Sequence, residues 1–164
     1  GLGIGMNPDM KKDIKSLSPR LALLPLATIL GSWLGAVVAY LIMNIDLTSV
    51  LQHRSLNDCL ALNSGFAYYS LSSIFITEYR GAELGTIALL ANIIREMTTL
   101  LLTPLLAKWF GPLAPISTGG ATTMDTTLPI ITQTIGQRYV ALSIYHGFVT
   151  DFSVPFLVTM WCML

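Results

Sequence analysis

An uncharged run of 23 residues, Leu21 to Met43, restricts the chain to folds that place a helix in a lipid bilayer. A helix needs about 20 mostly apolar residues to cross the hydrocarbon core, and this run is long enough. Pro25 lies in its first turn, where the missing N–H costs little. We therefore predict a membrane-spanning helix with a face of small residues that suits close helix packing. Its members are Gly31, Gly35, Ala36 and Ala39.

The composition fits a membrane protein, because only 11% of the residues are charged, whereas a soluble domain carries about 25%. Nine basic and nine acidic residues cancel, so no bulk charge indicates a nucleic-acid partner. Cys59 and Cys162 form neither a disulfide framework nor a metal-ligand spacing. We expect two packed free thiols; a disulfide is the alternative, since both are predicted near one membrane face.

Four further apolar segments follow the first one. They are Cys59–Thr77, Leu84–Ala107, Leu113–Ile135 and Tyr139–Leu164. The chain is therefore predicted to be an all-α, polytopic integral membrane protein with about five hydrophobic segments, forming a single transporter domain over residues 1–164. The run Gly1 to Gly5 is too short for a signal peptide. It predicts the end of an apolar helix whose start lies upstream.

Basic residues on short loops predict the orientation of a membrane protein. If all five segments cross, six basic residues lie on one side and two on the other, which places the start of the first span in the cytoplasm. The six are Lys11, Lys12, Lys15, Arg20, Arg80 and Arg138, and the two are Arg54 and Lys108. A re-entrant fourth segment would change part of this count.

The fourth segment carries groups that lipid does not tolerate. Besides Gly119, Gly120 and Asp125 it contains hydroxyl residues that include Thr122, Thr123 and Thr126. Such a sequence is tolerated where a helix breaks and its free backbone groups line a cavity. Pro129 cannot donate to the carbonyl group of Asp125. We therefore predict a discontinuous helix here.

A break near Gly120 predicts a binding site for both charges of an amino acid. A half-helix that starts there offers free N–H groups to an anion, and Asp125 offers a carboxylate to a cation. The alternative is a kinked helix in which Asp125 is only a cap. An acid inside a membrane costs about 2.5–3.5 kcal/mol, which favours a functional role.

The third segment has a polar stripe at helical spacing, formed by Asn92, Glu96, Thr99 and Thr103. Arg95 is beside the stripe and does not face Glu96, because adjacent helix residues diverge. We expect Arg95 to pair with an acid elsewhere, such as Asp125 or Asp151. The alternative is a buried ion pair that only fixes helix register.

The fifth segment places His146 on one face with hydroxyl residues, and Pro155 frees the carbonyl group of Asp151. His146 either passes protons or is simply hydrogen-bonded. Asp151 is expected to line water or to pair with Arg95. In the second segment, Tyr69 and Ser72, with neighbouring hydroxyl residues, either line a substrate path or join helices. The strings that begin at Gly65 and at Gly120 are loosely alike, which alone does not establish an internal repeat.

Several strings resemble the lysine exporter LysO family, in the same order and over nearly the whole chain. They are residues 65–72 with Thr77 and Glu78, Asn92 with Arg95 and Glu96, residues 120–129, and residues 146–148. The string Gly-Ala-Thr-x-Met-Asp-x-Thr-Leu-Pro is the most specific of them. Family members are about twice as long, so the chain resembles their C-terminal half.

The resemblance implies an inner-membrane exporter of L-lysine that exchanges it for H⁺. It implies a role in export for Asp125 and a second acid in an N-terminal half or second chain. We expect Asp125 to bind an ammonium group or a proton, and Glu96 to be a second carboxylate for the cationic side chain. Arg95 would hold the acids ionised, the N–H groups near Gly119 and Gly120 would bind the α-carboxylate, and no cofactor is needed.

Two other functions fit the residues less well. An intramembrane aspartyl protease would use Asp125 and Asp151 as its two acids. However, the chain lacks the Gly-x-Gly-Asp string of such enzymes, so we expect no enzyme. A membrane subunit that only scaffolds a partner would need Asp125 for assembly rather than for efflux.

Overall fold

A computed structural model describes residues 19–45 and 55–164 of the chain. Within these residues the elements are helices without a strand. Three of the helices are long and apolar enough to cross a membrane. They are α3 (Leu24–Ile45), preceded by the short η1 (Pro19–Leu23), then α6 (Ala82–Phe110) and α9 (Val140–Met163). The predicted all-α membrane fold is confirmed.

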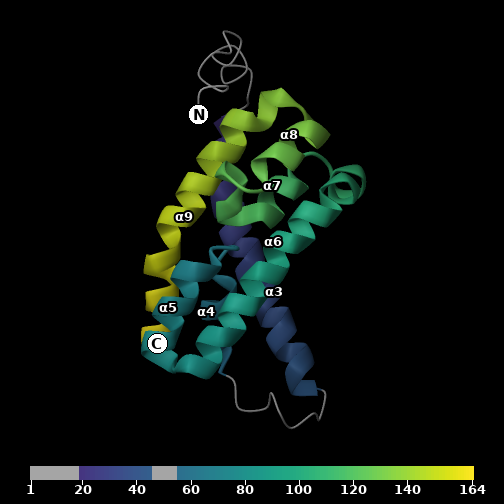
Figure 1. The fold of residues 1–164 in the computed structure, drawn as a ribbon. Helices are drawn as coiled ribbons and strands as arrows, with labels where there is room; N and C mark the ends of the chain where they lie inside the picture. The colour runs from purple at the N-terminus through teal and green to yellow at the C-terminus, as the bar shows by residue number, and fades with distance from the viewer. Residues whose placement is uncertain (1–18, 46–54) are drawn as a thin grey trace.

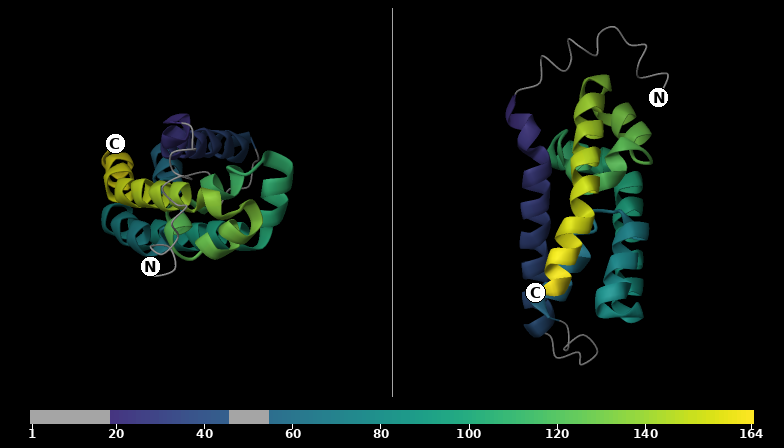
Figure 2. Two further views of the ribbon diagram at one scale, coloured as in Figure 1. Left: turned by 90° about the horizontal axis from the view of Figure 1, so that it is seen from above. Right: turned by 90° about the vertical axis from the view of Figure 1, so that its left-hand side faces the viewer.

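Helices α3 and α9 run in the same direction and pack on each other, while α6 runs opposite to both (Figures 1 and 2). Their outward faces are apolar: on α9, Phe148, Phe152 and Phe156 are each more than 60% exposed. A soluble protein rarely exposes such a patch to water, so these faces suit lipid or another membrane protein. The predicted helix end at residues 1–5, as well as Lys11, Lys12, Lys15 and Arg54, lies outside the described residues.

The second apolar segment does not cross; it forms a hairpin. It consists of α4 (Leu56–Asn63) and α5 (Tyr69–Arg80). Asp58 at its start lies 3.7 Å from Arg80 at its end, and Arg80 Nε donates to the carbonyl oxygen of Cys162 at 3.1 Å. An eight-residue helix is only about 12 Å long, less than half of the bilayer core. Both ends of this hairpin therefore lie beside the end of α9.

The fourth segment is a second hairpin, and its helix is broken as predicted. It consists of α7 (Ala114–Gly119), the 3₁₀ turn η2 (Gly120–Met124) and α8 (Leu128–Ile135). Leu113 and Ile135, from its two ends, pack against the same cluster, which includes Tyr139 of η3 (Gln137–Tyr139). This hairpin enters from the end where α9 begins (Figure 1). The five segments therefore do not all cross, so the condition under which the basic residues were counted does not hold.

Two reversals leave the predicted charge asymmetry in place. The second segment returns to the side on which it starts, so Arg80 lies on that side instead of crossing. Helix α6 then crosses in the opposite direction to the expected one, which places Lys108 on the side where α3 begins. Among the described residues, Arg20, Lys108 and Arg138 lie at the end where α3 begins, and Arg80 lies at the other end. The more basic end is still the one expected in the cytoplasm.

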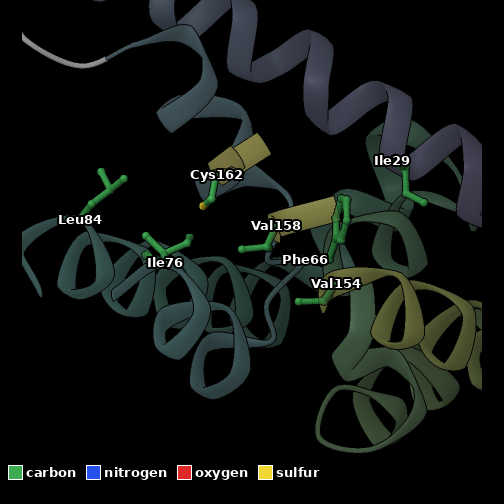
Figure 3. Packing of buried hydrophobic residues seen from close by; sticks show 9 residues of the cluster. Ile29, Phe66, Ile76, Leu84, Val154, Val158 and Cys162 are labelled. Carbon is green, nitrogen blue, oxygen red and sulfur yellow. The ribbon is translucent and has the colours of Figure 1, made fainter. Parts of the chain in front are cut away.

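The main hydrophobic cluster packs the first hairpin against α9, α3 and α6 (Figure 3). Phe66, Ile76 and Val158 are fully buried in it. Trp33 of α3 meets Trp161 of α9 edge to face, with ring centroids 5.3 Å apart. Cys59 and Cys162 are both buried and form no disulfide with each other, as expected.

Candidate functional site

The tips of the two hairpins meet in the interior of the bundle. The Ala121 N–H donates to the carbonyl oxygen of Phe66 at 2.9 Å. Phe66, Ala67 and Gly120 all have a positive φ, of 43°, 69° and 59°. Non-glycine residues rarely adopt this conformation, so the first tip must be held by its surroundings. The two loosely similar strings that begin at Gly65 and at Gly120 are these two tips.

Asn92 of α6 holds the first tip. Its Oδ1 accepts from the Ala67 N–H at 2.8 Å, and its Nδ2 donates to the carbonyl oxygen of Ala88 at 2.9 Å and to Ser72 Oγ at 3.3 Å. A Cβ atom at Gly65 would overlap the Asn92 amide, so only glycine allows this approach. Asn92 and Ser72, both predicted site residues, thus fix the tip in place.

Arg95, one turn further along α6, holds the second hairpin. Its Nε donates to the carbonyl oxygen of Thr118 at 2.9 Å, its Nη2 to that of Ser117 at 3.1 Å, and its Nη1 to Ser32 Oγ at 3.4 Å. The guanidinium carbon also lies 5.6 Å from the centroid of the Phe66 ring. These carbonyl groups belong to the last turn of α7 and would otherwise lack donors. Within the described residues, Arg95 therefore bonds to two carbonyl groups and one hydroxyl group and not, as expected, to Asp125 or Asp151.

The polarity expected at the helix break is also wrong. Helix α7 ends at Gly119, so the half-helix at Gly120 presents carbonyl groups to the break rather than the expected N–H groups. The Gly120 N–H donates to the carbonyl oxygen of Ile116, and the Ala121 N–H is already bound to Phe66. Gly119 and Gly120 are buried, and the N–H groups of Gly120 and Ala121 are not left for a carboxylate because both are already bound.

Asp125 lies at the end of η2, before α8 begins, and its side chain is exposed within this structure. Its Oδ1 accepts from the Thr126 N–H at 2.6 Å. The Thr126 hydroxyl donates to Glu96 Oε1 at 2.6 Å and lies 3.4 Å from Asp125 Oδ1. One threonine therefore joins the predicted acids of two different elements, while Asp125 Oδ2 is left for another ligand.

Asp125 and Asp151 share a pocket of about 130 Å³. Its other lining residues are Tyr68, Ala121, Thr122 and Met124. Asp151 is brought there by Gly147, one turn earlier on α9, where an added Cβ would lie 2.7 Å from the Met124 nitrogen. The missing side chain lets η2 lie directly on α9. Tyr69, for which we left open lining a path or joining helices, is 39% exposed and does not line this pocket; Tyr68 does.

His146 joins the second tip to α3. It is fully buried, with Nε2 2.9 Å from Thr28 Oγ1 and Nδ1 3.3 Å from Thr123 Oγ1. Thr123 Oγ1 also donates to the Ser143 carbonyl oxygen at 2.9 Å, and Thr122 Oγ1 donates to that of Gly119 at 2.9 Å. This arrangement favours the hydrogen-bonded role of His146 over proton passage.

Replacing His146 by leucine is expected to lower the free energy of unfolding by about 1–3 kcal/mol, since two buried hydroxyl groups lose a partner. Thermal unfolding in detergent measures this loss, with exposed Phe148→Leu on the same helix as the control. Transport by the folded fraction should keep its pH dependence. An unchanged stability together with an altered pH profile would assign His146 to the proton path instead.

Comparisons with known proteins identify the family of the chain. The model of the family described as "Lysine exporter LysO" matches residues 1–162. The chain belongs to this family. It is 32% identical over 87% of its length to the lysine exporter LysO of Escherichia coli, and 34% identical over 79% of its length to a putative lysine exporter of Haemophilus influenzae. The aligned regions cover 44% and 61% of those two proteins, and no solved structure matches the chain.

In this member of the LysO family, the described residues contain no group of three His, Cys, Asp or Glu side chains that could hold a metal ion. Sequence reasoning identified Asp125, Glu96 and Asp151, and the structure brings Asp125 next to each of the other two. It missed the roles of Phe66 and Gly147. The Gly147 signal was present, because a glycine beside a buried polar residue in an apolar helix allows another backbone to approach closely.

Proposed function

We propose that this LysO-family chain is part of a multi-pass inner-membrane exporter of L-lysine, coupled to H⁺ by antiport. One observation carries the proposal: Asp125 lies at a broken helix between the membrane-spanning helices and, although its side chain is exposed, it lines a pocket. Acids at such a depth are rare in membrane proteins, where they commonly mark substrate or proton paths.

The charges around the hairpin tips support a cationic substrate. Asp125, Glu96 and Asp151 supply three carboxylates, whereas Arg95 is the one Lys or Arg side chain near the tips within the described ranges. The Arg95 donors are bound to carbonyl groups of α7. An ammonium group or a proton would balance this excess of negative charge.

Antiport follows if the proton and the ammonium group compete for Asp125. A protonated Asp125 binds an ammonium group poorly, so proton binding on the outer side releases lysine, and proton loss on the cytoplasmic side restores the site. The chain spans about half the length of the curated relatives that it matches. We propose that an N-terminal half or a second chain, within the lipid bilayer, closes the open side of the pocket.

The test uses the protein as the cell assembles it, purified with any bound partner and reconstituted in lysine-loaded proteoliposomes with a pH gradient. Asp125→Asn is expected to abolish lysine efflux while its expression and elution profile stay normal. The control is Glu78→Gln, an exposed acid at the end of α5. If vesicles with Asp125→Asn export lysine as fast as wild type, the proposal is refuted. If Asp125→Asn fails to assemble with its partner, the result favours the scaffold function.

The pocket that Asp125 and Asp151 share keeps an aspartyl protease as the second candidate function, since such enzymes place two acids around one water. A protease predicts cleavage of transmembrane peptides by wild type and none by Asp125→Asn. The proposed exporter predicts no cleavage by either protein. Incubation with labelled transmembrane peptides in the same proteoliposomes separates the two functions.

A further inference from the structure

We infer that Asp151 selects substrates with a cationic side chain, by forming together with Asp125 the pocket that receives the side-chain ammonium group. The inference rests on the proposed transport function and deepens it. It also transfers the role expected for Glu96 to a different acid.

Asp151 lies where an unpaired carboxylate is most costly. It is the twelfth of the 24 residues of α9, so it is at the centre of a helix that is long enough to cross the membrane. In the described part of the chain it has neither a hydrogen-bond partner nor a cationic partner. A carboxylate held at mid-membrane depth without a partner needs a ligand to offset its cost.

The pocket supplies both acids to the same ligand. Asp125 comes from the second hairpin and Asp151 from α9, and both line the cavity of about 130 Å³. Glu96 does not line it, and its Oε1 accepts from the Thr126 hydroxyl instead. Two like charges in one pocket repel each other, and one ammonium group between them relieves the repulsion.

The size and lining of the pocket fit an aminoalkyl group. Its volume equals about four water molecules in the liquid, which suits the end of a side chain and not a whole amino acid. Tyr68, Ala121 and Met124 offer apolar contacts to methylene groups, and the acids accept the ammonium donors. The α-amino and α-carboxylate groups would then remain outside the pocket.

Norleucine is the matched probe, because it has the apolar part of the lysine side chain without the ammonium group. In proteoliposomes, excess norleucine should compete poorly with labelled lysine for wild-type protein, since it leaves both carboxylates unpaired. Asp151→Asn should lower the ratio of lysine to norleucine transport at least about tenfold, a change of about 1.4 kcal/mol. Asp151→Glu keeps the charge and should keep most of the preference.

The control is Ser153→Ala, a half-buried residue of the same helix whose hydroxyl bonds only to the Thr150 carbonyl oxygen at 2.7 Å. If Asp151→Asn keeps the wild-type preference for lysine, the inference is overturned. The proposed function still stands in that case, provided that Asp125→Asn loses lysine efflux. If Asp151→Asn and Asp151→Ser both fail to fold, the carboxylate is structural and the inference is likewise overturned. A wild-type protein that moves no lysine refutes the proposed function itself.

Discussion

Gly120→Ala is expected to separate the two hairpin tips and to abolish both the folded protein and its transport. Gly120 has φ +59°, and a Cβ atom there would overlap the carbonyl group of Phe66. That carbonyl group accepts the Ala121 N–H, so the bond between the tips would break as the backbones move apart. Overpacking lowers the free energy of unfolding by about 1–3 kcal/mol, and a buried N–H group that loses its hydrogen bond lowers it by about 1–3 kcal/mol more.

Gly111→Ala separates this steric effect from the cost of backbone conformation. Gly111 also has a positive φ, +87°, but an added Cβ meets nothing within 4 Å. Only the left-handed conformation is penalised there, by about 1–2 kcal/mol. Gly120→Ala should not elute as a single species, should show no cooperative thermal unfolding in detergent and should export no lysine. Gly111→Ala should elute as a single species, unfold cooperatively and export lysine. Similar losses in both variants would show that the tips do not depend on their close contact.

Local sequence rules were sufficient for part of the fold. The uncharged run that forms α3 predicted a membrane helix, since the length of a bilayer span is a local requirement. The break at Gly119 and Gly120 was predicted because glycines and threonines cannot face lipid in an intact helix. For the same reason, the position of Asp125 within an apolar segment predicted a site residue.

The two reversals could not be predicted from local rules. Cys59–Thr77 is long enough to cross, and its reversal depends on Phe66 and Ala67 adopting a conformation that non-glycine residues rarely adopt. What stabilises it is the bond from Ala67 to Asn92, 25 residues further along the chain. A contact over that distance leaves no trace in a local pattern.

The role of Arg95 was predicted wrongly although the sequence holds a relevant signal. A glycine with a positive φ commonly follows the end of a helix, and Gly120 follows α7 in this way. This rule favours carbonyl groups at the break, and carbonyl groups need a donor such as Arg95. The polar residues of α6 therefore have two functions: Asn92 and Arg95 hold the tips, and Glu96 reaches Asp125 through Thr126.

Arg95→Leu is expected to destabilise the protein by about 3 kcal/mol or more, because two carbonyl groups at the end of α7 lose charged donors worth about 1.5–3 kcal/mol each. Arg95→Lys should have an intermediate effect, since a lysine ammonium is a point charge that cannot span both oxygens as a guanidinium does. Thermal unfolding in detergent measures both losses.

The matched control is Arg138→Leu, an exposed arginine of η3 that stacks on Tyr139 with 4.6 Å between its guanidinium carbon and the ring centroid. Its loss should change stability by less than about 1 kcal/mol, as for exposed charges in general. If Arg95 is instead an anion-binding group for the substrate, Arg95→Leu will unfold at the wild-type temperature and lose only transport. Because the guanidinium is bound to Ser117 and Thr118 in the structure, we expect stability and transport to fall together.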